Sequence, residues 1–384
     1  MMRSVMRYKV GDKVRVRRDL NEDMTCNEFI VTTPMADKAG DIVTISAVHR
    51  RCYHIVECGW CMEDGIPDGW EYIEEKDDWW IPNGWYEMCS NCPNAIYFPL
   101  MKLSAWHKKN GDQVEWYDPL TAWLNPPDRV YMSKVFTFTP DYPHPVCAGE
   151  IVKGGTGYEY PSGGKPLPEK IEHIYPDYSL YPELCNNTAY GFLTRGCPRG
   201  CDFCIVKEKE GQKSHKVSDL SEFWNGQKNI VLLDPNMFAC RDWKNLSQQL
   251  IDSKAWIDFS QGCDIRIMTK EKAEYIKRMK IKQIHFAWDR YQDKDIIVPK
   301  FKAFKETTGW DRRKMTVYVL CGFDTTLEQD LDRIYTLRDL GYAPYVMIYD
   351  KYKLKKRDPL KRMQRWVNSR FAFMACERFE DYTG

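Results

Sequence analysis

Short apolar runs alternate with stretches of helical periodicity along the second half of the chain. Each run has the length of a buried strand, and a helical or loop-plus-helix segment follows every run but the last. The runs occupy residues 189–195, 229–233, 256–259, 283–288, 316–320 and 345–349. Strands separated by helices pair side by side in a parallel sheet. The pattern therefore predicts six βα units within residues 185–350.

The first segment has a different pattern, with apolar and polar residues in strict alternation. This alternation runs through residues 8–17, 39–45 and 52–56, and two of these stretches contain a Gly-Asp turn. A small all-β domain is expected over residues 1–80. It resembles an SH3-like β-barrel, a fold often used for binding, and would offer a surface for a macromolecular partner.

Between these two parts, residues 88–180 again predict an α/β domain. The expected helix covers residues 101–109, and the expected strands cover residues 95–100, 113–117, 128–133 and 150–156. After the last βα unit, residues 351–384 form a C-terminal extension with a basic run at 351–357 and an amphipathic helix over 360–373. Such a run is usually a solvated face, and a phosphate-rich partner is the alternative.

Composition and charge narrow the class of protein. The 384 residues carry a formal net charge of +1, so no global basic field favours non-specific binding to nucleic acid. No run of about 18 apolar residues or signal-peptide core is present, and we expect a cytoplasmic protein without membrane contact. Fifteen cysteines in so long a chain indicate a reducing, anaerobic interior instead of a disulfide scaffold.

Three of these cysteines form a compact motif. Cys197, Cys201 and Cys204 have C-x3-C-x2-C spacing, with a glycine directly before each of the first two and Phe203 just before the last one. A [4Fe-4S] cluster held entirely by protein needs four thiolates, so three leave one iron with an open coordination site. The alternatives are a zinc knuckle or scattered buried cysteines. Zinc sites more often combine two C-x2-C or C-x2-H pairs, which favours the cluster.

The motif resembles that of the radical S-adenosylmethionine (radical SAM) superfamily. The resemblance implies a partial (βα)6 TIM-type barrel over 185–350, with Cys197, Cys201 and Cys204 as catalytic metal ligands. It also implies S-adenosyl-L-methionine chelated by the open iron, and an electron donor such as flavodoxin or ferredoxin. Reductive cleavage of the sulfonium would give a 5′-deoxyadenosyl radical. Over residues 93–382 the chain as a whole resembles radical SAM proteins of anaerobic bacteria and their phages.

The resemblance places cofactor contacts at the strand ends, where loops carry the chemistry of such barrels. Asp234 stands where the family holds the amino group of the methionine moiety, although the usual Gly-Gly-Glu motif is absent. Asp264 and Arg266 could bind the charged groups of the cofactor or could simply pair with each other. The full set of predicted cofactor contacts is Phe203, Asp234, Gln261, Asp264, Arg266, Asp289, Gly322 and Phe323.

Residues 88–180 resemble, in order and content, the flavodoxin-like, cobalamin-binding-like domain that precedes many radical SAM barrels. Members that bind cobalamin carry a D-x-H-x-x-G motif, and around His107 neither the aspartate nor the glycine is present. Cobalamin is therefore not expected. Two C-x2-C pairs, Cys58 with Cys61 and Cys89 with Cys92, could form a zinc ribbon or be incidental thiols.

Other functions stay open on the sequence. The cluster could be structural or redox-sensing in an iron–sulfur binding protein that recruits a macromolecule through its β-domain. An RNA-modifying relative of the methylthiotransferases is a third interpretation. The near-zero net charge and the lack of three further N-terminal cysteines at cluster spacing count against it. The sequence does not name the substrate.

Overall fold

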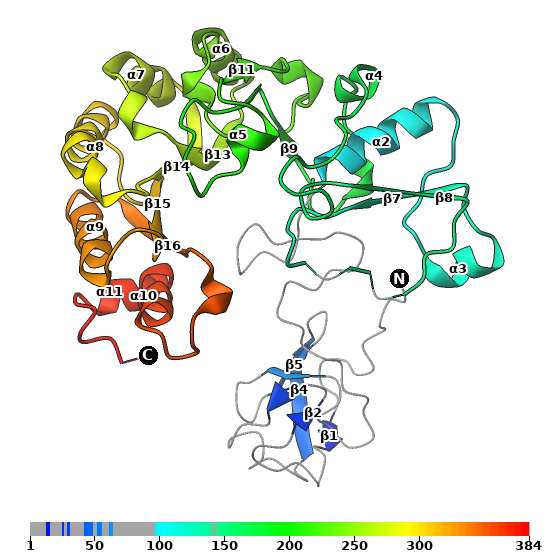
Figure 1. Cartoon of the computed structure of the whole chain (residues 1–384), viewed down its shortest axis with the longest axis horizontal. Coiled ribbons are helices and arrows are strands. Elements are labelled where there is room, and N and C mark those ends of the chain that lie inside the picture. The colour runs from blue at the N-terminus through cyan, green and yellow to red at the C-terminus, as the bar shows by residue number, and fades with distance from the viewer. Residues whose placement is uncertain are drawn as a thin grey trace. The chain divides into compact units, whose positions relative to one another are not determined.

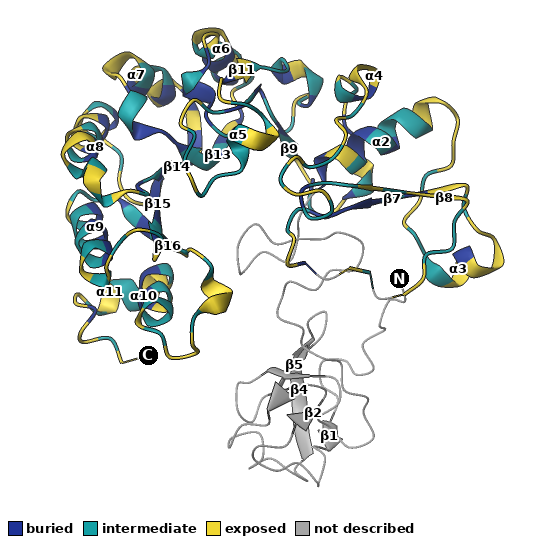
Figure 2. Ribbon diagram, viewed as in Figure 1, coloured by how far each residue is buried: buried dark blue, intermediate teal, exposed yellow. Residues whose placement is uncertain are grey.

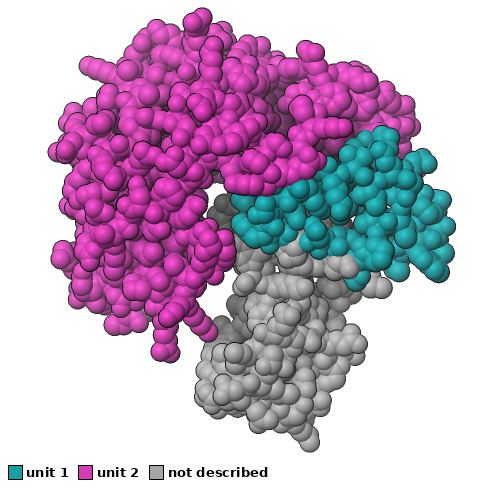
Figure 3. All heavy atoms as spheres, viewed as in Figure 1, with its two compact units in different colours: residues 1–95, 115–158 teal, residues 96–114, 159–384 magenta. Residues whose placement is uncertain are grey.

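The structure, a computed structural model, describes residues 97–383 except 140 and 143, together with the backbone of six short strands between residues 13 and 63. Residues 1–95 and 115–158 form one compact unit, and residues 96–114 and 159–384 form a second (Figure 3). The segment predicted as one α/β domain, residues 88–180, contributes to both units. The two units are treated separately below.

The early strands are all paired antiparallel. Their sheet has the order β1-β4-β5-β6, and β2 pairs with β3. Their bounds are Lys13–Arg15 (β1), Thr25–Cys26 (β2), Phe29–Ile30 (β3), Ile42–Val48 (β4), Cys52–Ile55 (β5) and Cys61–Glu63 (β6). The SH3-like barrel stays a prediction, because most of residues 1–80 lie outside the described residues. Cys58, Cys89 and Cys92 lie outside them too, and Cys61 is described only as backbone.

The described residues in the rest of the first unit contain one parallel pair of strands. β7 (Arg129–Ser133) and β8 (Glu150–Gly154) are paired in parallel, which confirms two of the predicted strands. The predicted strand at 113–117 is wrong: that segment joins no ladder and leads into α3 (Pro119–Leu124). Asp118 caps this helix, its carboxylate accepting a hydrogen bond from the Leu120 backbone.

The second unit begins with α2 (Phe98–Lys109), where we predicted a strand at 95–100 and a helix only from 101. The strand is wrong because Pro99 falls in the first helical turn, where its missing N–H costs nothing and its fixed φ suits the helix. Tyr97 is the N-cap residue. On the same helix, His107 Nδ1 lies 2.6 Å from an Asp112 carboxylate oxygen.

An open, entirely parallel six-stranded sheet is the centre of the second unit and confirms the predicted βα repeat. The strand order is β16-β15-β14-β13-β12-β9, so each strand lies beside its predecessor in the repeat. The strands are β9 (Thr188–Gly191), β12 (Asn229–Leu232), β13 (Trp256–Cys263), β14 (Lys280–Ala287), β15 (Met315–Cys321) and β16 (Ala343–Ile348).

Helices follow one another along one side of this sheet (Figure 1). They are α6 (Trp243–Ser253), α7 (Lys270–Arg278), α8 (Lys294–Thr308), α9 (Leu327–Asp339), α10 (Pro359–Asn368) and α11 (Arg370–Ala375). Alternate strand residues pack under them, as Phe286 does against Phe301 and Phe304 of α8. Figure 2 shows buried residues on the strands and on the inner helix faces. The predicted helix 360–373 is divided at Ser369, which caps α11.

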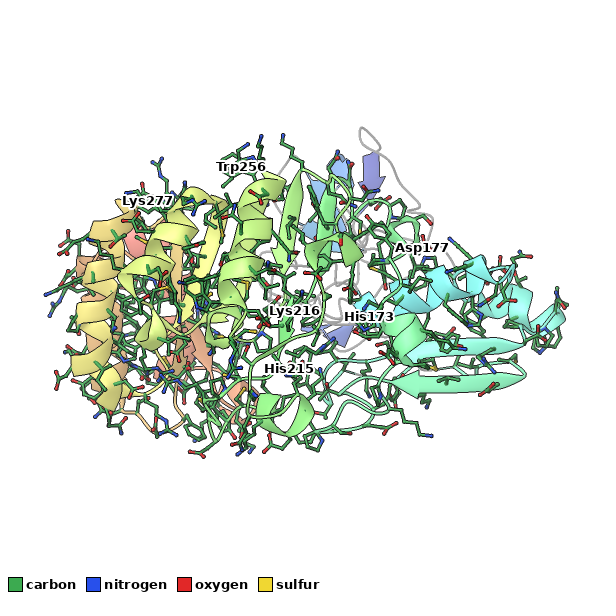
Figure 4. All side chains as sticks on the ribbon, turned by 90° about the horizontal axis from the view of Figure 1, so that it is seen from above. His173, Asp177, His215, Lys216, Trp256 and Lys277 are labelled. Atoms are coloured by element: carbon green, nitrogen blue, oxygen red, sulfur yellow. The ribbon has the colours of Figure 1, made fainter. Side chains whose placement is uncertain are left out.

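The first predicted strand, 189–195, is also divided. β9 ends at Gly191, and Thr194–Arg195 (β10) leaves the parallel sheet to pair antiparallel with His215–Lys216 (β11). In Figure 4, Trp256 at the amino end of β13 lies at the top of the view, and His215 lies well below it. Short helices α4 (Glu169–Glu172) and α5 (Val206–Lys209) complete the unit. Among the described residues, no helix has the length and apolar character to cross a membrane.

Candidate functional site

The three cysteines lie on a loop, residues 196–204, between β10 and α5. Gly196 opens the loop with a φ of +79°, and a Cβ there would stand 2.4 Å from the Lys213 carbonyl oxygen. Only glycine fits such a position without displacing the backbone. The Gly196 N–H donates to a Glu210 carboxylate oxygen at 3.1 Å. The backbone conformation at the start of the cysteine loop is therefore fixed.

A guanidinium from inside the loop holds it to the end of β13. Arg199 donates to both Asp264 carboxylate oxygens, from Nε at 2.5 Å and from Nη2 at 3.3 Å. Arg266 also donates to Asp264, from Nε at 2.7 Å, so the pairing of these two residues is present in the structure. Although burial works against it, these hydrogen bonds lower the pKa of the Asp264 carboxyl below its ordinary value.

Two further contacts, an exposed ion pair and a ring contact, join the loop to the ends of β14 and β15. Arg290, just after β14, donates to Asp202 at 3.0 Å. The Phe203 ring meets the Phe323 ring edge to face at 5.4 Å, and Phe323 follows Gly322 at the end of β15. Predicted cofactor residues from two distant segments are thus in contact.

On the β12 side, Asn236 lies against the first cysteine. Its Nδ2 donates to Cys197 Sγ at 3.5 Å, and the residue is only 2% exposed. Its Oδ1 is buried and has no hydrogen-bond partner among the described residues. A buried polar atom left unpaired costs about 1–3 kcal/mol, so a hydrogen-bond donor to this acceptor would stabilise the protein.

The thiols themselves are half-buried and form no disulfide. Burial, and then the Asp289 carboxylate, raise the pKa of Cys201, and burial raises that of Cys204. Each of these two thiols interacts electrostatically with Cys197, so the three cysteines form one group. The raised pKa values favour the protonated form of the Cys201 and Cys204 thiols, and binding a metal requires them to lose those protons.

Within the described part of the chain, no three His, Cys, Asp or Glu side chains are grouped as ligands of a single metal ion. A four-iron cluster requires a different arrangement, because each cysteine thiolate binds a different iron. The cysteine sulfurs are then farther apart than the ligands of a single metal ion. The donor set on the loop, three thiols without a fourth, is the set that such a cluster with one open iron requires.

Asp234 has a fully engaged carboxylate. It accepts hydrogen bonds from the Leu193 backbone at 3.1 Å and from the Thr194 backbone and hydroxyl at 2.5 and 2.6 Å. Burial raises its pKa to about 6, against the lowering effect of these bonds. The structure thus places Asp234 where it bends the chain out of β9 toward the cysteine loop.

The remaining predicted residues also lie at strand ends. Gln261 is half-buried on β13, where the register against β14 shifts between Phe259 and Cys263. Such irregularities redirect side chains and are frequent beside active sites. Burial raises the pKa of Asp289, after β14, to about 6. Gly322 has a φ of +76°, in the left-handed region that glycine adopts freely.

Comparison with known proteins adds little to this geometry. No protein-family model matches the chain, and no curated protein does either. A crystal structure of SuiB from Streptococcus suis aligns with 51% of this chain and 47% of its own length, at 12% identity and a TM-score of 0.35. The alignment spans about half of each chain, and a TM-score this low supports neither a shared fold nor a shared activity.

The structure also brings residues to the site that the sequence did not single out. Arg199, Asn236 and Arg290 contact the loop, and Arg333 of α9 lies behind it. Arg333 is fully buried and donates to the carbonyl oxygens of Trp288, Asp289 and Leu320 at 2.6 to 3.0 Å. Of these four residues, only Arg199 could have been predicted from the sequence, because it lies between two cysteines of the motif.

Proposed function

We propose that the chain is a radical SAM enzyme that holds a [4Fe-4S] cluster on Cys197, Cys201 and Cys204. It would use S-adenosyl-L-methionine to modify a substrate by radical chemistry. In this proposal the six-stranded sheet of residues 188–348 is the partial TIM-type barrel of such enzymes. The electron comes from a small redox protein of the flavodoxin or ferredoxin class.

One observation carries the proposal: the three-cysteine loop is held at the carboxyl ends of four successive parallel strands. Asn236 meets it after β12, Asp264 after β13, Arg290 after β14 and Phe323 after β15. Loops at this edge carry the chemistry of parallel α/β barrels. A structural or incidental group of thiols would have no need of four separate attachments there.

The residues present fit the cluster and its cofactor. When bound, the cluster and S-adenosylmethionine would supply the chemistry: one electron from the donor cleaves a carbon–sulfur bond of the sulfonium and gives methionine and a 5′-deoxyadenosyl radical. Asn236 Oδ1 would accept a hydrogen bond from the methionine ammonium. Phe203 and Phe323 would form the apolar wall beside the adenine, and Asp289 would face the ribose or substrate.

Arg199 and Asp264 have a positioning role in this proposal, because they fix the loop on β13 before any ligand arrives. A preformed loop spends little binding energy on ordering and keeps the thiolates in place during turnover. Asp234 contributes in the same way by bending the chain between β9 and β10. The cofactor roles of Asp234, Gln261, Asp264, Arg266 and Gly322 remain predictions.

The ligand assignment is tested by removing one thiol. After anaerobic reconstitution, we expect Cys201→Ala to lose the full four-iron content and to release no 5′-deoxyadenosine with S-adenosylmethionine and dithionite. Cys376→Ala is the matched control, because Cys376 is also half-buried but lies in the C-terminal extension. Iron and sulfide analysis and mass spectrometry give the two readouts.

Two outcomes would count against the proposal. A Cys201→Ala protein with four irons and normal cleavage would show that the motif is not the ligand set. A wild-type protein that shows the cluster absorbance but never cleaves S-adenosylmethionine would instead favour an iron–sulfur binding protein without radical turnover.

A further inference from the structure

A dense group of positive charges follows the last strand of the sheet. The segment 351–357 begins three residues after β16 ends, so it leaves the carboxyl edge, where the cysteine loop also lies. We call its cations the basic rim: Lys351, Lys353, Lys355, Lys356 and Arg357. All five are exposed. Since the net charge of the whole chain is only +1, this positive field is local.

A row of aromatic rings connects the rim to the candidate site. Tyr349 contacts the Phe323 ring at 4.8 Å, and Phe323 in turn contacts Phe203 of the cysteine loop at 5.4 Å. The Tyr349 backbone donates to the Cys321 carbonyl at 3.0 Å, which fixes the exit of the chain from β16. A polymer lying on the basic rim would therefore pass close to the loop.

The charges of the rim are largely available to a ligand. Lys353 pairs with Asp350 at 2.6 Å. Lys355, Lys356 and Arg357 form no ion pair with any described residue. Between the first two lysines stands Tyr352, which is 75% exposed, with Lys353 Nζ 5.6 Å from its ring centre. This exposed aromatic ring, beside cations on both sides, contributes little to the packing of the protein.

We propose that the basic rim binds a single-stranded nucleic acid and presents it to the radical site. Cations gain affinity by releasing counterions from a phosphate backbone, and an exposed aromatic ring stacks on any base. An acidic protein would use the charges but would have little use for an isolated tyrosine ring. The substrate part of the proposal rests on the proposed radical SAM function, whereas the binding part does not.

The experiment measures binding of fluorescein-labelled oligo(dT) and oligo(U) 20-mers to the reconstituted full chain without reductant. We expect the triple variant Lys355→Gln, Lys356→Gln, Arg357→Gln to bind on the order of 100-fold more weakly at 0.1 M salt. We also expect its salt slope to fall by about 2, at roughly 0.7 per phosphate contact on single strands. Comparing the two oligomers distinguishes DNA from RNA.

A matched control removes three other exposed cations: Lys302→Gln, Arg312→Gln, Arg313→Gln. These lie on α8 and on the turn that enters β15 from the opposite, amino edge. It lowers the net charge by the same amount, so any general electrostatic effect appears in both variants. We expect its affinity for either oligomer to stay within about twofold of wild type.

A second variant tests the aromatic contact. Tyr352→Ala should weaken oligonucleotide binding on the order of tenfold and leave the salt slope unchanged, because stacking releases no counterions. Circular dichroism checks that each variant is folded, and a folded Tyr352→Ala protein with wild-type affinity for both oligomers would contradict the stacking role.

Three results would overturn the proposal. The first is a wild-type protein that binds neither oligonucleotide at about 0.05 M salt, which is below physiological ionic strength. The second is an equal loss of affinity in the rim variant and the control variant. The third is binding of flavodoxin that depends on the rim while oligonucleotide binding does not. The outcome is separable from that of the proposed function. Rim-dependent binding without 5′-deoxyadenosine release would refute only the radical chemistry, and 5′-deoxyadenosine release without rim-dependent binding would refute only the nucleic-acid site.

Discussion

At the scale of single residues, Asn236 has the most informative environment. Its buried Oδ1 lacks a partner within the described residues, while its Nδ2 contacts Cys197. If this oxygen accepts from a cofactor ammonium, Asn236→Ala should weaken S-adenosylmethionine binding roughly tenfold, the worth of a hydrogen bond to a charged group. Equilibrium dialysis on reconstituted protein measures this.

The control for this prediction is Asn229→Ala, at the opposite end of β12, where the side chain donates a hydrogen bond to the Asn187 carbonyl. Its affinity should equal that of wild type. Equal affinities for all three proteins would remove Asn236 from the cofactor site.

Asp289 gives a pH dependence whose sign follows from its burial. Burial raises the pKa of Asp289 to about 6 in the folded chain, although the nearby charges of Arg333 and Arg266 lower it. In the unfolded chain an aspartate carboxyl has a pKa near 4. Between these values the folded state binds more protons, so this carboxyl lowers the free energy of unfolding as pH rises from about 4 to 6. Asp289→Asn removes the effect.

The measurement is urea unfolding of cluster-free protein at several pH values. The stability of the asparagine variant relative to wild type should increase between pH 4 and pH 7, by up to about 3 kcal/mol. A difference that does not change with pH would mean that Asp289 is not strained by burial.

At the scale of elements, the attachment of the cysteine loop to β13 should control cluster retention. Arg199→Ala loses a two-point, charge-assisted contact with Asp264, worth about 1.5–3 kcal/mol. We expect a chelator to remove iron about tenfold faster. Arg290→Ala breaks only an exposed pair with Asp202 and should change the rate little. Equal rates for both variants would show that the loop does not depend on β13.

Helix α9 is fixed to β15 and to the residues that follow β14 by Arg333, whose charge is paired with Asp330 of the same helix. Arg333 and Asp330 are both fully buried, 2.5 Å apart, and Arg333 also binds the strand-end carbonyls. Arg333→Ala leaves an unpaired buried carboxylate and should cost about 3–5 kcal/mol in urea unfolding. Lys244→Ala, which breaks the exposed pair with Glu271, should cost less than about 1 kcal/mol. Similar losses would contradict this assignment.

The same contrast between local and distant interactions explains what the sequence could predict. The six strands were predictable because helices cover one face and leave short apolar runs with turns between them. The strand predicted at 95–100 was wrong, because a short apolar run fits a strand and a buried helical turn equally well. Pro99 lies in the first turn of α2. The division between β9 and β10 depends on Asp234, which is 40 residues away and leaves no local pattern.

For the candidate site, the cysteine motif and the strand-end positions were predictable, but the contacts among them were not. Arg199 and Asp264 are 65 residues apart, and Asn236 and Cys197 are 39 apart. Which side chains meet depends on how far each strand extends beyond the sheet and where its loop turns. Sequence periodicity gives neither quantity within the needed one or two residues.

At the scale of the whole molecule, the candidate site depends on a long stretch of the second unit. Its contributions come from one loop and from the ends of four strands, β12 to β15. The basic rim leaves the same edge after β16 and would add the substrate side. Chemistry and substrate binding would then share one edge of one sheet.

The central claim is that the three-cysteine loop holds a cluster whose open iron activates S-adenosylmethionine. The most direct measurement is anaerobic incubation of the reconstituted wild-type chain with S-adenosylmethionine and dithionite, followed by quantification of 5′-deoxyadenosine and methionine. We predict equal amounts of the two products, accumulating with time and requiring both the cluster and the reductant. Intact S-adenosylmethionine in the presence of a complete, reduced four-iron cluster would contradict the claim.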